Sequence, residues 1–158
     1  MDAILAIDGN DMVDIPALDG GGATRVKGSI AYLDKDNNKL THLHILRFFL
    51  KLQVNIRLYH WTTLSYSRHI ATDKLDASLL PLVDDFVETF MAEFDRPPKH
   101  LKKVNLSCRI ASDERMKKYV ARKRLELMEM SLPTKDLDSV RDEIVSALSK
   151  TLYLFDTI

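Results

Sequence analysis

The sequence has almost no cysteine, no long apolar run and no excess of charge of either sign. Its single cysteine, Cys108, excludes a disulfide within the chain, and a reducing compartment is the simplest interpretation. No apolar run reaches the roughly 18 residues that a membrane helix needs, and the first residues do not resemble a secretory signal. We therefore expect a soluble protein without membrane contact, located in the cytoplasm or packed into a particle made there.

The charge balance and the missing motifs exclude several classes of function. Lysine and arginine total 23, and aspartate and glutamate also total 23, so binding of nucleic acid through a basic excess is not expected. The sequence has no glycine-rich phosphate loop and no serine nucleophile elbow. Cys108 has no histidine or aspartate at a spacing that would activate its thiol. These patterns indicate no catalytic residue and no cofactor-binding motif.

The first 38 residues differ in composition from the rest of the chain. They contain three consecutive glycines, Gly20 to Gly22, and five aspartates precede the first basic residue, Arg25. Segments rich in strand-forming residues are too short for an independent sheet. Residues 1–38 are therefore predicted to be an irregular arm that is flexible or depends on a partner. The alternative is an arm that folds on a neighbouring subunit or on another protein.

From residue 39 onward the pattern is helical. Apolar residues recur three and four positions apart over residues 41–64, 67–94, 112–130 and 138–155. Pro97 and Pro98 follow the second segment, Ser112 is a suitable N-cap for the third, and Pro133 separates the third from the fourth. We predict an all-α domain over residues 39–158 that forms an up-down four-helix bundle.

The apolar positions also predict which helix faces are buried. In the first helix one face carries Leu43, Leu46, Leu50, Gln53, Arg57, His60 and Leu64, and it becomes polar towards its end. The second helix has Leu75, Leu79, Leu82, Phe86 and Phe90, widened by Leu80, Val83 and Val87. The third has Met116, Val120, Leu127 and Met130, and the fourth has Val140, Ile144, Leu148 and Leu152. Buried polar groups are costly unless paired, so the polar end of the first stripe requires an explanation.

Four residues along the first two helices form a candidate metal site. His60 precedes the only tryptophan, Trp61, and His69 follows nine positions after His60. Asp84 lies fifteen positions after His69, and Glu88 lies four positions after Asp84. Two imidazoles and two carboxylates form a donor set that suits Fe, Mn or Zn better than Ca. Asp84 and Glu88 lie on one helix face and could hold one ion together.

This order of residues resembles that of the Dps proteins, the miniature ferritins that oxidise and store iron. In that family a first helix ends in His-Trp and a second histidine begins the next helix. An aspartate and a glutamate then follow at spacings of fifteen and four, as Asp84 and Glu88 do after His69. The resemblance implies a ferritin-like bundle that forms at least a homodimer. It implies that His60 and His69 bind iron(II) together with Asp84 and Glu88 of the twofold partner, and that peroxide or dioxygen oxidises the iron beside Trp61.

The sequence also departs from this family. The gap between the two histidines is three residues shorter, almost one helical turn, and the glycine-containing segment after His-Trp is replaced by residues 62–67. The two imidazoles then need not converge, and the alternative is that they bond to aspartates of the second helix without a metal. A di-iron centre within one chain is not expected, because it needs two Glu-x-x-His pairs and none occurs.

Two functions remain open from the sequence. The first is an iron-binding protein with ferroxidase activity at a dimer interface. The second is a non-enzymatic structural or assembly component, such as a minor capsid or virion protein. The chain also resembles an uncharacterised ferritin-like family of large DNA viruses in its His-Trp segment, its Asp85-Phe86-Val87-Glu88 pattern and its C-terminal end. The acidic arm and the neutral net charge favour this second hypothesis.

Overall fold

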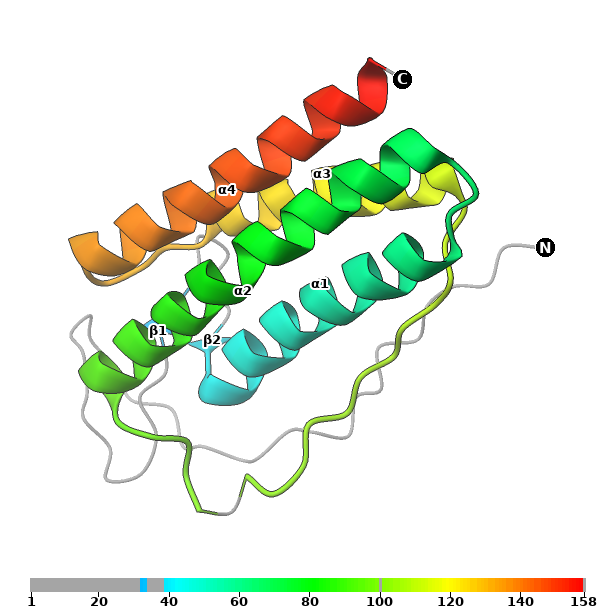
Figure 1. Cartoon of the computed structure of the whole chain (residues 1–158). Helices are drawn as coiled ribbons and strands as arrows, with labels where there is room; N and C mark the ends of the chain where they lie inside the picture. The colour runs from blue at the N-terminus through cyan, green and yellow to red at the C-terminus, as the bar shows by residue number, and fades with distance from the viewer. Residues whose placement is uncertain (1–31, 34–38, 100, 158) are drawn as a thin grey trace.

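The computed structural model describes residues 32–33, 39–99 and 101–157. Four helices make up most of this part: α1 (His42–Thr62), α2 (Tyr66–Phe94), α3 (Asp113–Glu129) and α4 (Lys135–Asp156) (Figure 1). Two short strands, β1 (Tyr32–Leu33) and β2 (Lys39–Leu40), pair antiparallel. The predicted all-α class is therefore confirmed apart from this pair. The prediction of an irregular arm over residues 1–38 lies, except for β1, outside the described residues.

Side-chain caps mark where three of the four helices begin. Thr41, Ser65 and Thr134 have extended backbones, and each accepts a hydrogen bond from the main-chain N–H three residues later. Ser112 is the N-cap of α3, as predicted, although its side chain makes no capping bond. The first turn of α3 carries Asp113 and Glu114, which the helix dipole favours. All four predicted helices agree with the observed bounds to within three residues.

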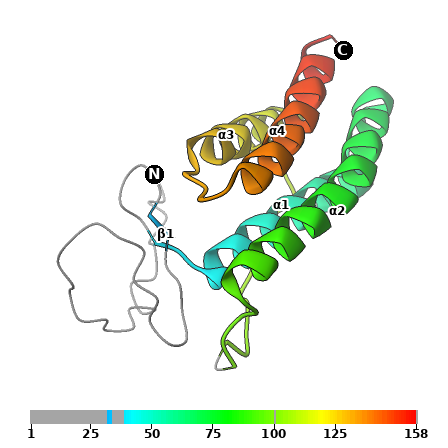
Figure 2. The ribbon, with the colours of Figure 1, turned by 90° about the vertical axis from the view of Figure 1, so that its left-hand side faces the viewer.

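The four helices form two antiparallel hairpins (Figure 2). Residues 63–65 join α1 to α2, and residues 130–134 join α3 to α4. The connection between the hairpins, described over residues 95–99 and 101–112, runs along the bundle, so α3 begins at the end of the molecule where α2 begins (Figure 1). Helices alternate in direction within each hairpin, but α2 and α3 run the same way, so the predicted up-down order does not hold between these two helices.

The order of the helices around the bundle follows from their contacts. α2 packs on both α1 and α4, and α3 packs on α4 and, less extensively, on α1. Because of the long connection, every pair of neighbouring helices in this arrangement is antiparallel. One crossover thus replaces the short α2–α3 loop of a simple up-down bundle.

One apolar core lies between the four helices. The rings of Phe49 and Phe86 pack with centroids 4.8 Å apart, which joins α1 to α2. The predicted stripes of the other helices supply much of the rest, with buried Leu75, Leu79, Phe90, Met116, Val120, Leu127, Met130, Ile144 and Leu148. Leu82, Val140 and Leu152 are partly buried against this core. The prediction was wrong for Leu80, which is 60% exposed on the outer side of α2.

The buried face of α1 differs from the predicted one. Leu50 is 39% exposed, and Leu64 lies beyond the helix and is fully exposed. The core contains instead Ile45, Phe48, Phe49, Leu52, Ile56 and Tyr59. Three aromatic rings on this face remove more apolar area from water than the leucines of the predicted face, and the free energy of burial grows with that area. The polar end of the predicted stripe is explained by its position near the surface.

A polar cluster joins the four helices next to the α1–α2 turn. The Tyr59 hydroxyl donates a hydrogen bond to Asp113 Oδ1 at 2.7 Å. The Arg68 guanidinium donates to the main-chain oxygens of Asp113 and Phe155 at 3.1 and 3.3 Å, and it lies 4.6 Å from the centroid of the Phe155 ring. Burial and the bond to Asp113 raise the pKa of Tyr59, so its hydroxyl stays a donor. The cluster fixes the position where α3 begins.

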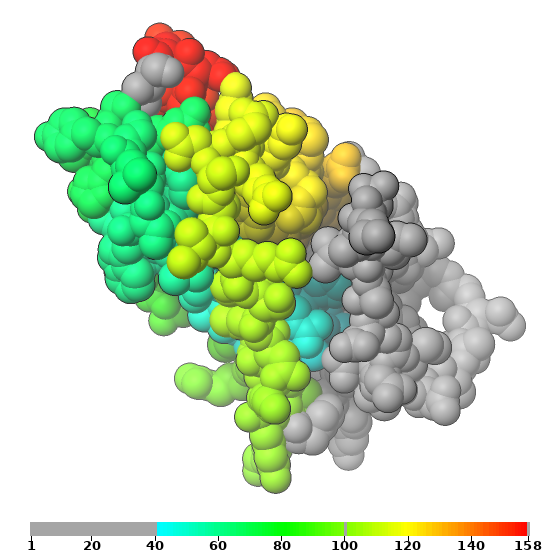
Figure 3. Space-filling model, turned by 90° about the vertical axis from the view of Figure 1, so that its right-hand side faces the viewer, coloured from blue at the N-terminus to red at the C-terminus, as the bar shows by residue number. Residues whose placement is uncertain are grey.

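Asn55 of α1 holds the connection against the bundle. Its buried side chain donates to the Lys51 main-chain oxygen at 2.7 Å and to the Tyr119 hydroxyl at 3.3 Å. Its Oδ1 accepts the main-chain N–H of Arg109 at 3.3 Å. Burial also raises the pKa of Tyr119 far above its ordinary value. The connection, yellow-green in Figure 3, crosses the surface on the side of α1 and α3.

We expect Asp113→Ala to lower the free energy of unfolding by about 1–3 kcal/mol, because the buried Tyr59 hydroxyl loses its acceptor. Glu114→Ala is the matched control, since it removes an acid from the same helical turn. Glu114 is exposed and pairs with an exposed lysine, Lys118, at 3.5 Å, so we expect a change below about 0.5 kcal/mol. Urea unfolding followed by circular dichroism measures both variants. Equal decreases in the free energy of unfolding for the two variants would show that the polar cluster does not stabilise the fold.

Asn55→Ala is expected to loosen the connection while the bundle stays folded, because the Arg109 N–H loses its acceptor. Trypsin cleaves after lysine and arginine, so cleavage within residues 102–109 should become about tenfold faster. Gln53→Ala, a change on the same helix, is the control and should leave the rate unchanged. Timed digestion and mass measurement of the fragments give the rates. Equal rates in Asn55→Ala and the parent protein would contradict this role of Asn55.

Candidate functional site

The α1–α2 turn brings His60 and His69 into contact. Their ring centroids are 4.0 Å apart and their planes are inclined by 23°, so the rings stack. His60 Nδ1 lies 3.2 Å from the main-chain oxygen of His69, and His69 Nδ1 lies 2.9 Å from the main-chain oxygen of His60. The shortened gap between the histidines therefore does not keep them apart. They meet through a reciprocal pair of hydrogen bonds.

A turn of only three residues produces this contact. The Thr63 N–H donates to the Tyr59 main-chain oxygen, and Thr63 Oγ1 accepts from the Ser65 N–H at 3.2 Å. Ser65 in turn caps α2 by accepting from the Arg68 N–H. The last turn of α1 therefore lies beside the first turn of α2, and residue 60 faces residue 69.

The hydrogen bonds determine which nitrogen of each ring remains available. A main-chain oxygen can only accept, so Nδ1 carries the proton in both His60 and His69. In the neutral ring Nε2 then has the lone pair, and an Nδ1–H bond to an acceptor is what orients histidines that bind metals. Asp73 Oδ1 lies 4.0 Å from His60 Nε2. The pair thus presents two ring nitrogens of the kind that a transition metal binds.

The two predicted acidic ligands lie further along α2. Asp84 and Glu88 are exposed and share one helix face. Asp84 lies fifteen positions after His69, which corresponds to about 22 Å along the helix axis. The imidazoles and the carboxylates therefore do not meet within one chain. Over residues 32–33, 39–99 and 101–157, no three His, Cys, Asp or Glu side chains form a group that could hold a metal ion.

Trp61, Leu64 and Tyr66 form an exposed apolar surface around the same turn, which we call the turn surface. Their exposed fractions are 67%, 103% and 80%. The end of the hairpin that carries them projects at the upper left of Figure 3. Grouped apolar side chains at a surface indicate an interaction site more strongly than single ones do. The sequence pattern predicts Trp61 only as a neighbour of the metal and gives no sign of this surface.

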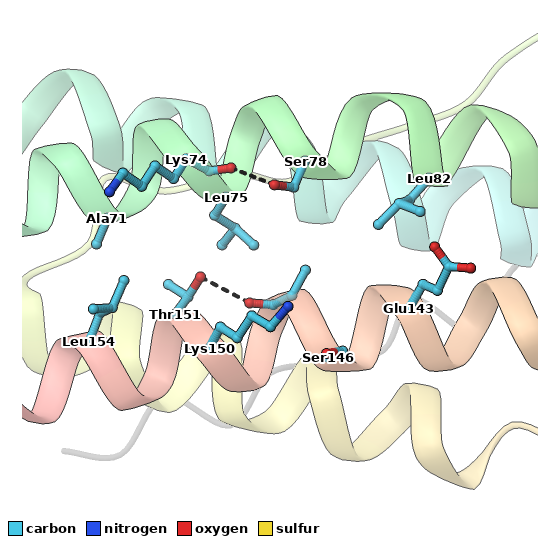
Figure 4. Close-up of a pocket in the computed structure, with 11 residues that line it drawn as sticks. Ala71, Lys74, Leu75, Ser78, Leu82, Glu143, Ser146, Lys150, Thr151 and Leu154 are labelled. Carbon is cyan, nitrogen blue, oxygen red and sulfur yellow. Dashed lines mark hydrogen bonds between the residues drawn. The ribbon is translucent and has the colours of Figure 1, made fainter.

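A groove between α2 and α4 was not predicted from the sequence (Figure 4). It has a volume of about 400 Å³ and is lined by Ala71, Lys74, Leu75, Ser78 and Leu82 of α2 and by Glu143, Ser146, Ala147, Lys150, Thr151 and Leu154 of α4. Apolar periodicity placed Leu75 in the core but does not say which helices are neighbours, so the groove carried no sequence signal.

Comparison with known proteins places the chain in a family. The sequence model of a family of unknown function, DUF5856, matches residues 60–155, a span that begins at His60 and contains α2, the connection, α3 and most of α4. No curated protein and no solved structure matches the chain. In the part that the structure describes, no helix is both long enough and apolar enough to cross a membrane. Since the match covers more than half of the sequence, this protein belongs to DUF5856, a family of unknown function.

Proposed function

We propose that this protein is a ferritin-like metal-binding bundle in which His60 and His69 supply two imidazole ligands to a transition metal ion. Iron is the first candidate, with manganese and zinc as alternatives. The contact between the two imidazoles carries this proposal, because it brings two ring nitrogens with available lone pairs to one turn. Asp84 and Glu88 of a second copy complete the site. Oxidation of iron(II) to iron(III) by peroxide or dioxygen, with iron as the substrate, is the activity that this site would support.

The path of the chain supports the ferritin-like part of the proposal. Ferritin-like bundles consist of two helical hairpins with one long crossover. Residues 95–112 connect α2 to α3 over the length of this bundle. A bundle with short loops throughout would have α2 and α3 antiparallel.

The donor set suits the proposed metals, but the stacked rings must separate to share one ion. Metal–nitrogen bonds to histidine are about 2.0–2.1 Å long, and each lone pair lies in its ring plane. Two planes inclined by 23°, with centroids 4.0 Å apart, do not converge at so short a range. Binding by both His60 and His69 therefore requires one imidazole to turn, which breaks one of the reciprocal bonds.

A second copy can supply the acids because Asp84 is exposed on α2 and lies towards the same side of the helix as His69, which borders α1. Residues fifteen positions apart return to within about 60° of the same side of a helix. A twofold axis that places His69 opposite Asp84 of the partner subunit crosses α2 near residues 76 and 77. This geometry pairs the two α2 helices antiparallel.

The surface near that axis is suited to a helix–helix contact. Ala77 is small and exposed, and Leu80, one turn further along α2, is 60% exposed. Asp76 would approach its own copy across the axis, and two unpaired carboxylates would repel each other. Arg57 of α1 donates to Asp76 Oδ2, with Nε at 3.1 Å, and this ion pair reduces the repulsion.

We expect His69→Ala and Asp84→Ala each to weaken the binding of Zn²⁺, or of Fe²⁺ without oxygen, by about a hundredfold. His44→Ala and Asp85→Ala are matched controls, because they remove exposed residues of the same types outside the proposed ligand set. Isothermal titration calorimetry measures the affinities. Binding that all four variants retain would exclude the proposed ligands.

Mixing the two variants tests whether the ligands come from two chains. In a twofold dimer that combines His69→Ala and Asp84→Ala copies, one of the two sites regains all four ligands. Random exchange makes half of the dimers mixed, so about a quarter of the sites should recover. Aerobic oxidation of Fe(II), followed by ferric absorbance, should recover to the same extent. No recovery would contradict the shared site, and oxidation no faster than in buffer would contradict a ferroxidase.

The turn surface favours a second candidate function, an assembly role without catalysis, for example as a structural component of a virion. Trp61, Leu64 and Tyr66 expose apolar area that a protein contact would remove from water. This role needs neither a metal nor the acidic face of α2. The two proposals differ in the exposed leucine that contributes to self-association. It is Leu64 of the turn surface here, and Leu80 near the twofold axis in the metal-binding dimer.

Leu64→Ser is expected to shift the self-associated protein towards the monomer if the turn surface is the contact. Leu80→Ser is the matched variant, because it makes the same substitution on the face of α2 near the proposed twofold axis. Sedimentation velocity measures the species present. Dissociation by Leu64→Ser alone supports assembly through the turn surface, whereas dissociation by Leu80→Ser alone contradicts it and supports the metal-binding dimer.

A further inference from the structure

We propose that the groove between α2 and α4 binds a single-chain anionic amphiphile, namely a fatty acid carboxylate. This proposal is independent of the metal site, because the groove uses neither the histidine pair nor the outer side of α2. It rests on the shape of the groove, on the apolar character of its floor and on two lysines at its rims (Figure 4).

The shape of the groove suits one extended chain. Ala71 and Leu82 stand eleven positions apart on α2, which gives a length of roughly 16 Å. A volume of about 400 Å³ over that length corresponds to a mean cross-section of about 25 Å². Such a space admits an alkyl chain along the helices but is narrow for a ring system. Its volume lies within the range of small-molecule sites.

The floor of the groove is apolar and its polar groups are satisfied. Ala71 and Leu75 are buried, and Leu82 and Leu154 flank them at the two ends. Thr151 is also buried, but its hydroxyl donates to the main-chain oxygen of residue 147 at 3.1 Å. An alkyl chain would therefore meet apolar atoms and leave no polar group of the floor without a partner.

The rims supply the charge. Lys74 of α2 and Lys150 of α4 leave their helices at nearly the same level, on opposite sides of the groove (Figure 4). Both are exposed, and neither ammonium group forms an ion pair or hydrogen bond with a residue that the structure describes. Their positive charges along the groove attract an anionic headgroup and repel a cationic one.

Glu143 sets the direction of the bound chain. It stands at the Leu82 end of the groove, away from the Ala71 end towards which the Lys74 ammonium group extends (Figure 4). Glu143 repels a carboxylate and the Lys74 ammonium group attracts it, so the headgroup lies towards Ala71 and Leu154, while the Lys150 ammonium group extends towards Ser146 at the middle of the groove. The alkyl tail then runs over Leu75 towards Leu82.

Calorimetric titration of the full chain with laurate, below its micelle concentration, tests the proposal. We expect saturable binding of one laurate per chain, and weaker binding of dodecanol and dodecyltrimethylammonium. The double variant Lys74→Glu/Lys150→Glu should bind laurate about tenfold more weakly. The control Lys102→Glu/Lys103→Glu makes the same change of charge on exposed residues of the connection and should bind like the parent protein. His69→Ala should also bind normally.

A second variant tests the groove itself. Ser146→Trp places a large side chain on an exposed rim position, so the fold should persist, as circular dichroism will show, while laurate binding is lost. Equal affinity for laurate and dodecyltrimethylammonium, or normal binding by either groove variant, would overturn the proposal. An absence of laurate binding by the parent protein would also overturn the proposal. If the parent protein were then a dimer that Ser146→Trp dissociates, the groove would be occupied by a second copy of the chain.

Discussion

The guanidinium of Arg68 connects the start of α2 to the first residue of α3 and to the last turn of α4. The fold depends on this connection because the chain must cross the whole bundle between its two hairpins. Ordering residues 95–112 costs conformational entropy, and the α3–α4 hairpin could otherwise slide along α2. At the opposite end of the bundle, His42 Nε2 lies 2.8 Å from the main-chain oxygen of Asp95, the residue with positive φ that ends α2. The connection is thus fixed where it leaves α2 and where it enters α3.

Sequence periodicity was sufficient where one helix face was clearly more apolar than the others. On α3, almost the only large apolar residues at helical spacing are Met116, Val120 and Leu127, and all three are buried. α1 is different, because apolar residues occur on more than one of its faces. Periodicity cannot choose between two such faces, and the choice was made by the aromatic rings that reach across to α2.

The candidate site was predictable in its residue types and not in its geometry. The sequence indicated His60 and His69 as a pair, but their stacking depends on the three residues of the turn and on two main-chain oxygens. No side-chain pattern encodes these. The distance between His69 and Asp84 can be predicted from the rise of a helix alone. This distance already excludes a four-ligand site within one chain. The groove depends on which helices become neighbours, and this is decided by the crossover.

The two proposed binding sites and the core use different sides of α2. Leu79 and Phe86 face the core, residues 71, 75 and 82 face the groove beside α4, residues 69 and 76 contact α1, and Asp84 is exposed. A ligand in the groove would act on the contact between α2 and α4, while the histidine pair is held by the contact between α1 and α2. Coupling between two sites needs an element whose arrangement both of them bias. The short turn and the Arg68 cluster hold the start of α2 against α1, α3 and α4 alike, so the structure provides no second arrangement of that end. Metal binding and groove binding should therefore be thermodynamically independent.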